Sequence, residues 1–166
     1  HDYSTVINDL NCSIEVINNN GTVLCDDYDL SYAPGVKKAI DEFVEQLGLN
    51  NVTTLNGRAE EIWQNLDYRE QFDYVTSRAT AYFPTLLEYV IPLLKVGWIF
   101  AAYKLDDKEE LKSAKKALHK LWAKILKVKN YSLWWQDRTI VLIEKIVRTN
   151  IKYPRKIWVP LASPLK

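Results

Sequence analysis

The sequence predicts an α/β fold: a Rossmann-like sheet, mostly parallel, with an antiparallel strand at its edge. Residues 51–104 alternate between short runs typical of strands and longer runs with helical periodicity, and residues 123–145 hold two further strand-like runs. Turn signals rich in Gly, Pro and Asn separate several of these runs. Strands that alternate with helices form a parallel sheet, and such sheets bind ligands beyond the carboxyl ends of their strands.

Residues 51–104 contain the clearest elements. Residues 52–55 resemble a short strand that ends at the turn Asn56-Gly57, and residues 72–75 form a second alternating run. Residues 83–94 carry apolar side chains at the i, i+3, i+4 spacing of a buried helix. Residues 99–103 are almost continuously apolar, which predicts a strand covered on both faces.

The flanking regions are assigned from turn and capping signals. Residues 13–17 and 22–25 flank Asn18 to Gly21 and predict a hairpin. A helix is expected from Pro34 to Gly48. A Lys-rich helix from about Asp107 to Trp122 should precede a strand at 123–128. Residues 137–145 are expected to pair with that strand in antiparallel fashion at the sheet edge.

Length and composition predict one soluble domain over residues 1–166. The 166 residues are 48% hydrophobic and 26% charged, and no apolar run approaches the roughly 18 residues of a membrane span. We therefore expect a cytoplasmic protein, a monomer without membrane contact. Cys12 and Cys25 lack nearby His residues, so they favour reduced side chains over a metal site.

The formal charge of +1 conceals a strong asymmetry. Residues 1–103 hold 6 Lys+Arg and 15 Asp+Glu, whereas residues 104–166 hold 16 Lys+Arg and 6 Asp+Glu. Such asymmetry indicates nucleic-acid binding by the basic half, although a Lys-rich helix is also typical of a solvated face. The basic tail, residues 147–166, contains three prolines and is expected to be extended, since proline disfavours a regular helix or central strand.

Polar residues at strand ends are the candidate ligand site. Glu60 follows the first predicted strand and Arg78 follows the second, where an acceptor and a five-donor fork suit a nucleotide-like ligand. Asp26 follows the predicted strand 22–25, where a carboxylate can accept hydrogen bonds from a ribose diol. The alternatives are an ordinary first-turn acid for Glu60 and a solvated loop acid for Asp26.

Five motifs carry a resemblance to a known family: GRAEEI, REQFDYVTSRA, LLEYVIPLLKVG, DRTIVLIEK and KYPRK. Together they resemble the bacterial small-subunit ribosomal RNA methyltransferase G family from about Leu47 to Leu165. The resemblance implies methyl transfer from S-adenosylmethionine to N7 of a guanine in 16S ribosomal RNA of the small subunit. It implies a cofactor pocket with Ala59, Glu60 and Arg78, to which Asp26 is added, and RNA contacts by Arg138, Lys152, Arg155 and Lys156. It identifies no catalytic residue and no metal.

The chain departs from that family in two ways. The glycine-rich cofactor loop and the N-terminal helices are missing before Gly57, where glycine occurs only at isolated positions. Tryptophan stands where glycine is expected, at or near Trp98, Trp122, Trp158 and one of residues 134 and 135. Such positions often have positive φ, which bulky residues tolerate badly, unless the indoles stack on RNA bases. We therefore expect a truncated, decayed or altered relative, with a non-catalytic RNA- or ribosome-binding module, or a fold without retained function, as alternatives.

Overall fold

The structure is a computed structural model that describes residues 3–14, 34–48, 59–78, 81–105, 108–133 and 136–165. The chain divides into two compact units, residues 1–57 and 58–166, which are described separately below. The single-domain assignment made from length stays a prediction.

The first unit contains two amphipathic helices, α1 (Tyr3–Ile14) and α2 (Pro34–Gln46). Leu10 of α1 packs with Val36, Ile40 and Phe43 of α2. The predicted helix at 34–48 is thus confirmed, and it ends where Gly48 adopts φ +59°. The predicted strand at 13–17 is wrong at its first two residues, which belong to α1, because the apolar spacing of that helix continues to its end. The rest of the predicted hairpin, residues 15–25, lies outside the described residues.

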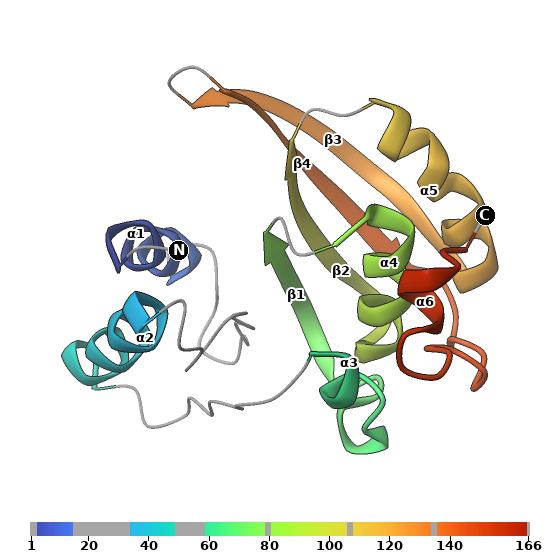
Figure 1. The fold of residues 1–166 in the computed structure, drawn as a ribbon, viewed down its shortest axis with the longest axis horizontal. Helices are drawn as coiled ribbons and strands as arrows, with labels where there is room; N and C mark the ends of the chain where they lie inside the picture. Colours follow the sequence, from blue (N-terminus) through green and yellow to red (C-terminus); the bar gives the residue numbers. More distant parts are fainter. Residues whose placement is uncertain are drawn as a thin grey trace. The chain divides into compact units, whose positions relative to one another are not determined.

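The second unit is built on a four-stranded sheet in the order β1-β2-β4-β3 (Figure 1). The strands are β1 (Phe72–Arg78), β2 (Leu94–Leu105), β3 (Ala123–Leu133) and β4 (Gln136–Lys145). β1 is parallel to β2, whereas β4 is antiparallel to both β2 and β3. Three of the four strands therefore run in one direction, which confirms the α/β class.

The antiparallel strand does not lie where the sequence predicted. β4 sits between β2 and β3, and β3 takes the outer position. The reason is tertiary: β4 turns back from β3 and also pairs with β2, aligning buried Val141 and Ile143 with buried Ala102 and Phe100. Burial of this matched apolar row favours the inserted position.

One face of the sheet forms the core. Val75, Phe100, Ala102, Val141 and Ile143 are all at most 2% exposed. The helices α4 (Phe83–Val90) and α5 (Lys108–Leu121) pack together and lie beside the sheet, with the 3-10 helix η2 (Ile91–Leu93) continuing α4 (Figure 1). Every residue of α4 is buried. A buried Leu or Phe side chain contributes about 1.5–3 kcal/mol, so this face supplies most of the unit's stability.

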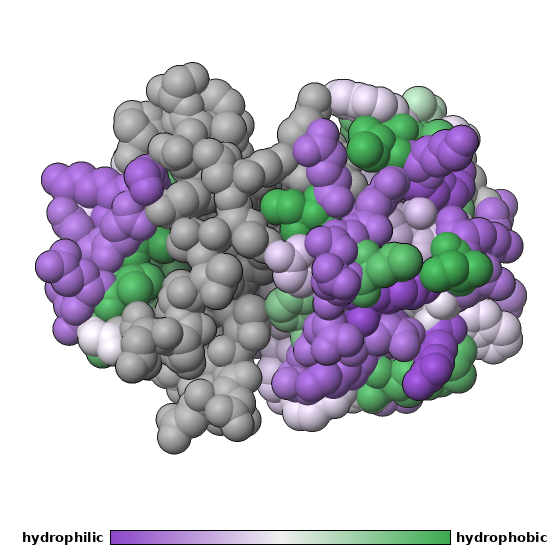
Figure 2. Space-filling view, turned by 90° about the horizontal axis from the view of Figure 1, so that it is seen from below, coloured by the Kyte–Doolittle hydropathy of each residue, from purple (hydrophilic) through white to green (hydrophobic). Residues whose placement is uncertain are grey.

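The other face is not covered by the described residues. The neighbouring side chains Thr76, Ala101, Leu142 and Lys127 form one row across it, and none of them is buried. The prediction that residues 99–103 are covered on both faces is therefore wrong for the described part of the chain. Figure 2 shows hydrophobic areas interspersed with hydrophilic ones on one side of this unit.

The remaining elements flank the sheet. The short helix α3 (Ala59–Ile62) and the 3-10 helix η1 (Leu66–Tyr68) precede β1, and α6 (Val159–Ala162) lies near the C-terminus. The one-turn helix α6 departs from the predicted extended tail, because Pro160 lies in its first turn, where no backbone N–H is required. No described helix is long and apolar enough to span a membrane.

Three of the four positions where the resemblance places glycine, Trp98, Trp122 and Trp158, lie in the described residues. The predicted end of the Lys-rich helix near Trp122 is confirmed: α5 ends at Leu121, and Trp122 follows with φ +55°. Trp158 has φ +72°. Trp98 instead lies within β2, packed edge-on against Tyr74 at 5.2 Å, and its neighbour Gly97 takes the positive φ of +83°. Residues 134 and 135 lie outside the described residues.

Candidate functional site

The carboxyl ends of β1 and β2 form the rim at which an α/β sheet binds ligands. Arg78 ends β1 and pairs in register with Tyr103 of β2, while Leu105 at the end of β2 pairs with Arg138 near the start of β4. Because β4 runs against β2, Arg78 and Arg138 belong to the same rim. The backbones of the sequence-predicted cofactor residue and of one predicted RNA residue are thus about 12 Å apart, across two strand spacings and two residues along β4.

A largely buried ion pair lies at this rim. Lys104 Nζ lies 2.7 Å from Glu110 Oε1 and donates to the carbonyl of Ala81 at 2.8 Å. The same Glu110 oxygen accepts from the backbone N–H of Phe83 at 2.7 Å, at the start of α4. Both side chains are less than 15% exposed. One carboxylate therefore holds β2, α4 and α5 together below the rim, and it is already fully engaged in this structural role.

The helix that carries Ala59 and Glu60 lies at the other end of β1. Figure 1 shows α3 beside the amino end of this strand. The contacts agree: Trp63, directly after α3, stacks on Tyr89 at 4.4 Å, and Gln64 donates to the carbonyl of Arg155. The four residues of α3 span about 6 Å, whereas the seven residues of β1 span about 20 Å. A helix of this length at the amino end of β1 does not reach the rim at its carboxyl end.

The prediction that Glu60 and Arg78 lie at one rim is not met by the described backbone, because α3 lies at the amino end of β1 and Arg78 at its carboxyl end. It assumed that the strand predicted at 52–55 would deliver α3 to the rim, and that segment lies outside the described residues, as do Asp26 and the side chains of Ala59, Glu60 and Arg78. The structure thus describes the rim itself and the backbone of Arg78, and their cofactor roles stay predictions.

The basic tail residues lie in the loop between β4 and α6. Arg155 makes a bidentate contact with Glu88 of α4, with Nε at 2.9 Å and Nη2 at 2.8 Å from its oxygens. Hydrogen bonding to Glu88 raises the pKa of Arg155. Lys152 and Lys156 are exposed, and the Lys152 ammonium lies 5.1 Å from the Tyr153 ring centre. Sequence reasoning missed Glu88, because an acid inside an apolar helix carries no local sign of its distant partner.

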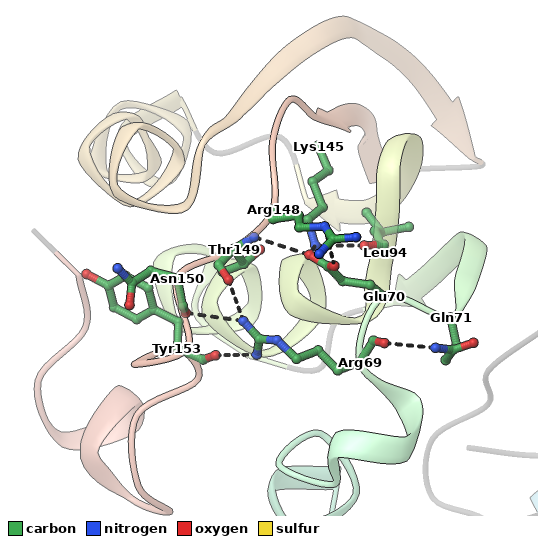
Figure 3. Close-up of polar contacts among 9 residues, drawn as sticks. All are labelled: Arg69, Glu70, Gln71, Leu94, Lys145, Arg148, Thr149, Asn150 and Tyr153. Carbon is green, nitrogen blue, oxygen red and sulfur yellow. Dashed lines mark hydrogen bonds and ion pairs between the residues drawn. The ribbon is translucent and has the colours of Figure 1, made fainter.

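A second buried cation lies beneath this loop (Figure 3). Lys145 is 0% exposed and donates to Glu70 Oε1 at 2.8 Å and to the carbonyl of Leu94 at 2.7 Å. Burial lowers the pKa of Lys145, opposed by Glu70. Desolvation raises the pKa of Glu70, but the hydrogen bond and charge of Lys145 outweigh it and lower that pKa overall. By geometry, the pair links the end of β4 to the start of β2 and to the segment before β1.

A small pocket of about 100 Å³ opens beside the loop, lined by residues including Trp63, Arg69 and Tyr153. Ligand pockets for small molecules typically enclose about 300–1,000 Å³, so this pocket is too small for a nucleoside cofactor. Its position at the amino end of β1 also separates it from the rim. Within the described residues, no group of three or more His, Cys, Asp or Glu side chains is arranged to hold a metal ion.

Solved structures with a similar fold define the class of protein. A Thermoplasma acidophilum protein matches with a TM-score of 0.61 and 16% identity, over 85% of this chain and 64% of that one. An rRNA methylase from Streptococcus thermophilus matches at 0.54 and 16%, over 69% of each chain. A methyltransferase from Pyrococcus furiosus matches at 0.54 and 17%, over 83% and 69%. The fold is that of the methyltransferase sheet.

The sequence matches narrow this class to one family. Residues 37–141 match the GidB family, rRNA small subunit methyltransferase G, and the chain belongs to that family. The enzyme of this name from Acetivibrio thermocellus is 41% identical over 77% of this chain and 54% of its own length. The Lactococcus lactis enzyme is 47% identical over 74% and 52%. The chain therefore spans about half the length of these curated relatives.

Proposed function

We propose that this protein acts in the transfer of a methyl group from S-adenosylmethionine to N7 of a guanine in 16S ribosomal RNA. The observation that carries this proposal is family membership: the match covers residues 37–141 and includes β1, α4, β2 and α5. Relatives at 41–47% identity are named as ribosomal RNA small subunit methyltransferase G. We further propose that the protein works as a cytoplasmic monomer on the small ribosomal subunit.

The methyl donor makes limited demands on the protein. Its sulfonium carries an already activated methyl group, so the protein chiefly supplies binding and orientation. The described residues do not complete a nucleoside pocket, because α3 and the rim lie at opposite ends of β1 and the pocket beside α3 is small. We propose Arg78 as the rim residue that binds the donor carboxylate, with Ala59, Glu60 and Asp26 as further pocket residues.

We propose the RNA contacts from the excess of positive charge in the C-terminal part of the chain. Residues 104–166 carry 16 Lys+Arg against 6 Asp+Glu, and cations that neutralise phosphates release counterions and give salt-dependent affinity. Arg138 lies at the rim near Arg78, while Lys152, Arg155 and Lys156 lie in the loop after β4. We propose that the first contacts RNA near the reacting base and that the loop contacts the backbone farther away.

Two measurements test this function. In calorimetry, S-adenosylmethionine should bind with micromolar affinity, and Arg78→Met should weaken that binding about tenfold, equivalent to about 1.4 kcal/mol. Lys95→Met, an exposed residue near the amino end of β2, is the matched control and should bind normally. Small ribosomal subunits that lack the methyl group should then accept label from tritiated donor at one guanine, whereas methylated subunits should not.

The alternative is a module that binds ribosomal RNA without transferring a methyl group. It is favoured by the separation of α3 from the rim in the described residues. This module would be supported, and the enzyme rejected, by three results together. Calorimetry would detect no binding of S-adenosylmethionine, the ribosomal subunits would receive no tritium, and salt-dependent RNA binding would be intact.

A further inference from the structure

The loop of residues 146–157, between β4 and α6, is held through its backbone by side chains from other elements. Arg69 donates to the carbonyls of Thr149, Asn150 and Tyr153 at 2.6, 3.2 and 2.7 Å (Figure 3). Gln64 donates to the carbonyl of Arg155 at 2.7 Å. A loop without strand partners has backbone groups to satisfy, and here side chains from outside the loop satisfy them.

Two acids hold the loop's backbone N–H groups. Glu70 Oε1 accepts from Thr149 N at 3.3 Å, and Glu88 Oε1 accepts from Arg155 N at 2.8 Å. Each acid also engages a cation at least partly withdrawn from solvent: Glu70 pairs with Lys145 and Glu88 with Arg155. Glu88 is 0% exposed, and Arg155 Nη2 also donates to the carbonyl of Ser163. Charge-assisted hydrogen bonds of this kind have a defined geometry, so each pair holds the loop backbone in one position.

These contacts turn the remaining loop cations toward solvent. Arg148 is 88% exposed, although its Nε lies 3.7 Å from Glu70 Oε2, and Lys152 and Lys156 are exposed as well. The three cations follow at intervals of four residues, and residues 145–166 contain six Lys or Arg and no acid. Of the two acids that reach the loop, Glu70 is shared by Lys145 and Arg148, and Glu88 pairs with Arg155. The loop therefore carries an excess of positive charge on a backbone that is held by these contacts.

We propose that three exposed cations of this loop, Arg148, Lys152 and Lys156, bind RNA phosphates, and that Glu88 and Arg69 are their positioning residues. These three cations are called the row below, from their order in the sequence. Arg155 belongs to the clamp that shapes this row. The inference rests on the proposed ribosomal RNA function, because an acidic protein surface would present the same charge. A fixed row of cations binds a phosphate backbone without the cost of ordering a flexible loop.

The test uses a fluorescein-labelled single-stranded RNA and anisotropy over a series of KCl concentrations. Each of Arg148→Ala, Lys152→Ala and Lys156→Ala should reduce the slope of log affinity against log salt by about 0.7, the value per phosphate contact on a single strand. Unchanged slopes in all three variants would overturn the row. No binding by the unaltered protein would instead reject the proposed RNA function itself.

Glu88→Gln separates positioning from net charge. The change makes the protein more positive by one charge, so charge alone predicts tighter RNA binding, whereas loss of the clamp predicts weaker binding, by about tenfold, and a smaller salt slope. Glu109→Gln, an exposed acid on α5 that is 79% exposed, is the matched control and should bind at least as well as the unaltered protein. Equal behaviour of the two Gln variants would overturn the positioning role.

Two further variants distinguish loss of the clamp from loss of the folded state. Glu88→Leu combined with Arg155→Met removes the buried pair without leaving one buried charge alone, so it should stay folded and still lose the salt slope. Arg69→Lys keeps the charge, but a single ammonium group cannot reach all three carbonyls as the guanidinium does. This variant should also bind RNA more weakly. Normal RNA binding by both folded variants would overturn the clamp. Poly-glutamate that competes as well as RNA would assign the row to an acidic protein partner.

Discussion

At the scale of single residues, two tryptophans occupy backbone conformations that favour glycine. Trp122 has φ +55° and Trp158 has φ +72°, and their side chains are 55% and 50% exposed. A residue with a Cβ in this region costs about 1–2 kcal/mol, and about half of each indole stays in solvent, which limits how much of that cost burial offsets. Trp122 also occupies the position after a helix where glycine is the usual residue.

Glycine at either position should therefore stabilise the protein. Trp122→Gly and Trp158→Gly are each expected to raise the free energy of unfolding by about 1 kcal/mol, measured by urea denaturation. Trp98→Gly is the control and should destabilise, because Trp98 lies in β2 and packs on Tyr74. Destabilisation by all three changes would show that the indoles are held by contacts stronger than the strain.

The gene offers an independent check on these positions. One common cause would account for both strained tryptophans. A UGA codon, which some genetic codes read as tryptophan and others as glycine, replaces one by the other at many sites at once. We expect UGA at positions 122 and 158 and glycine in peptide mass spectra of the protein from its natural host. A UGG codon at both positions would exclude this explanation.

Glu70 combines positive φ, at +55°, with the buried partner Lys145. Glu70→Gln should lower the free energy of unfolding by about 3 kcal/mol, the lower end for a broken buried pair, because Glu70 is 22% exposed. The pKa of Glu70 is lowered in the folded state, so its contribution is complete above the ordinary value of 4.5 and is lost as pH falls through the lowered value.

Denaturation at several pH values measures this effect. The stability difference between the unaltered protein and Glu70→Gln should be constant from pH 7 to about pH 5 and should shrink at lower pH. Glu109→Gln, whose acid is exposed, should show a small difference at every pH. A Glu70→Gln difference that does not change with pH would mean that the Lys145 pair contributes little.

At the scale of elements, the two faces of β2 differ in what covers them. Phe100 and Ala102 point into the core, whereas Ile99, Ala101 and Tyr103 lie on the face without a described cover. Phe100→Ala should cost about 3–5 kcal/mol, and Ile99→Ala about 1 kcal/mol, since a partly exposed side chain leaves no enclosed cavity. Urea denaturation of both variants checks this, and an equal cost would reveal a cover over the second face.

At the scale of the whole molecule, the second unit contains a complete core on one face of its sheet. Residues 58–166 include all four strands, α4 and α5. We expect a fragment of residues 58–166 to unfold cooperatively on heating, because its largest fully buried side chains, including Phe83, Phe100 and Ile143, all lie within it. A non-cooperative transition, measured by circular dichroism, would mean that residues 1–57 are needed for folding.

The sequence by itself determined the local elements and the family. Apolar periodicity located α2, α4, α5 and the four strands, because burial on one side leaves a repeat of 3.6 or 2 residues in the chain. The motifs around Arg78 and Arg155 carried the resemblance to the methyltransferase family. The positive φ at Trp122 and Trp158 was expected from that resemblance, which places glycine at or near both positions.

Only the tertiary structure decided which distant residues meet. It put β4 between β2 and β3, brought α3 to the amino end of β1, and paired Arg155, a predicted RNA ligand, with buried Glu88. The physical reason is that each outcome depends on contacts between residues 20 or more positions apart. The type of a charged or apolar residue indicates which kind of contact it will make. Which residue it contacts depends on burial and geometry in the folded chain.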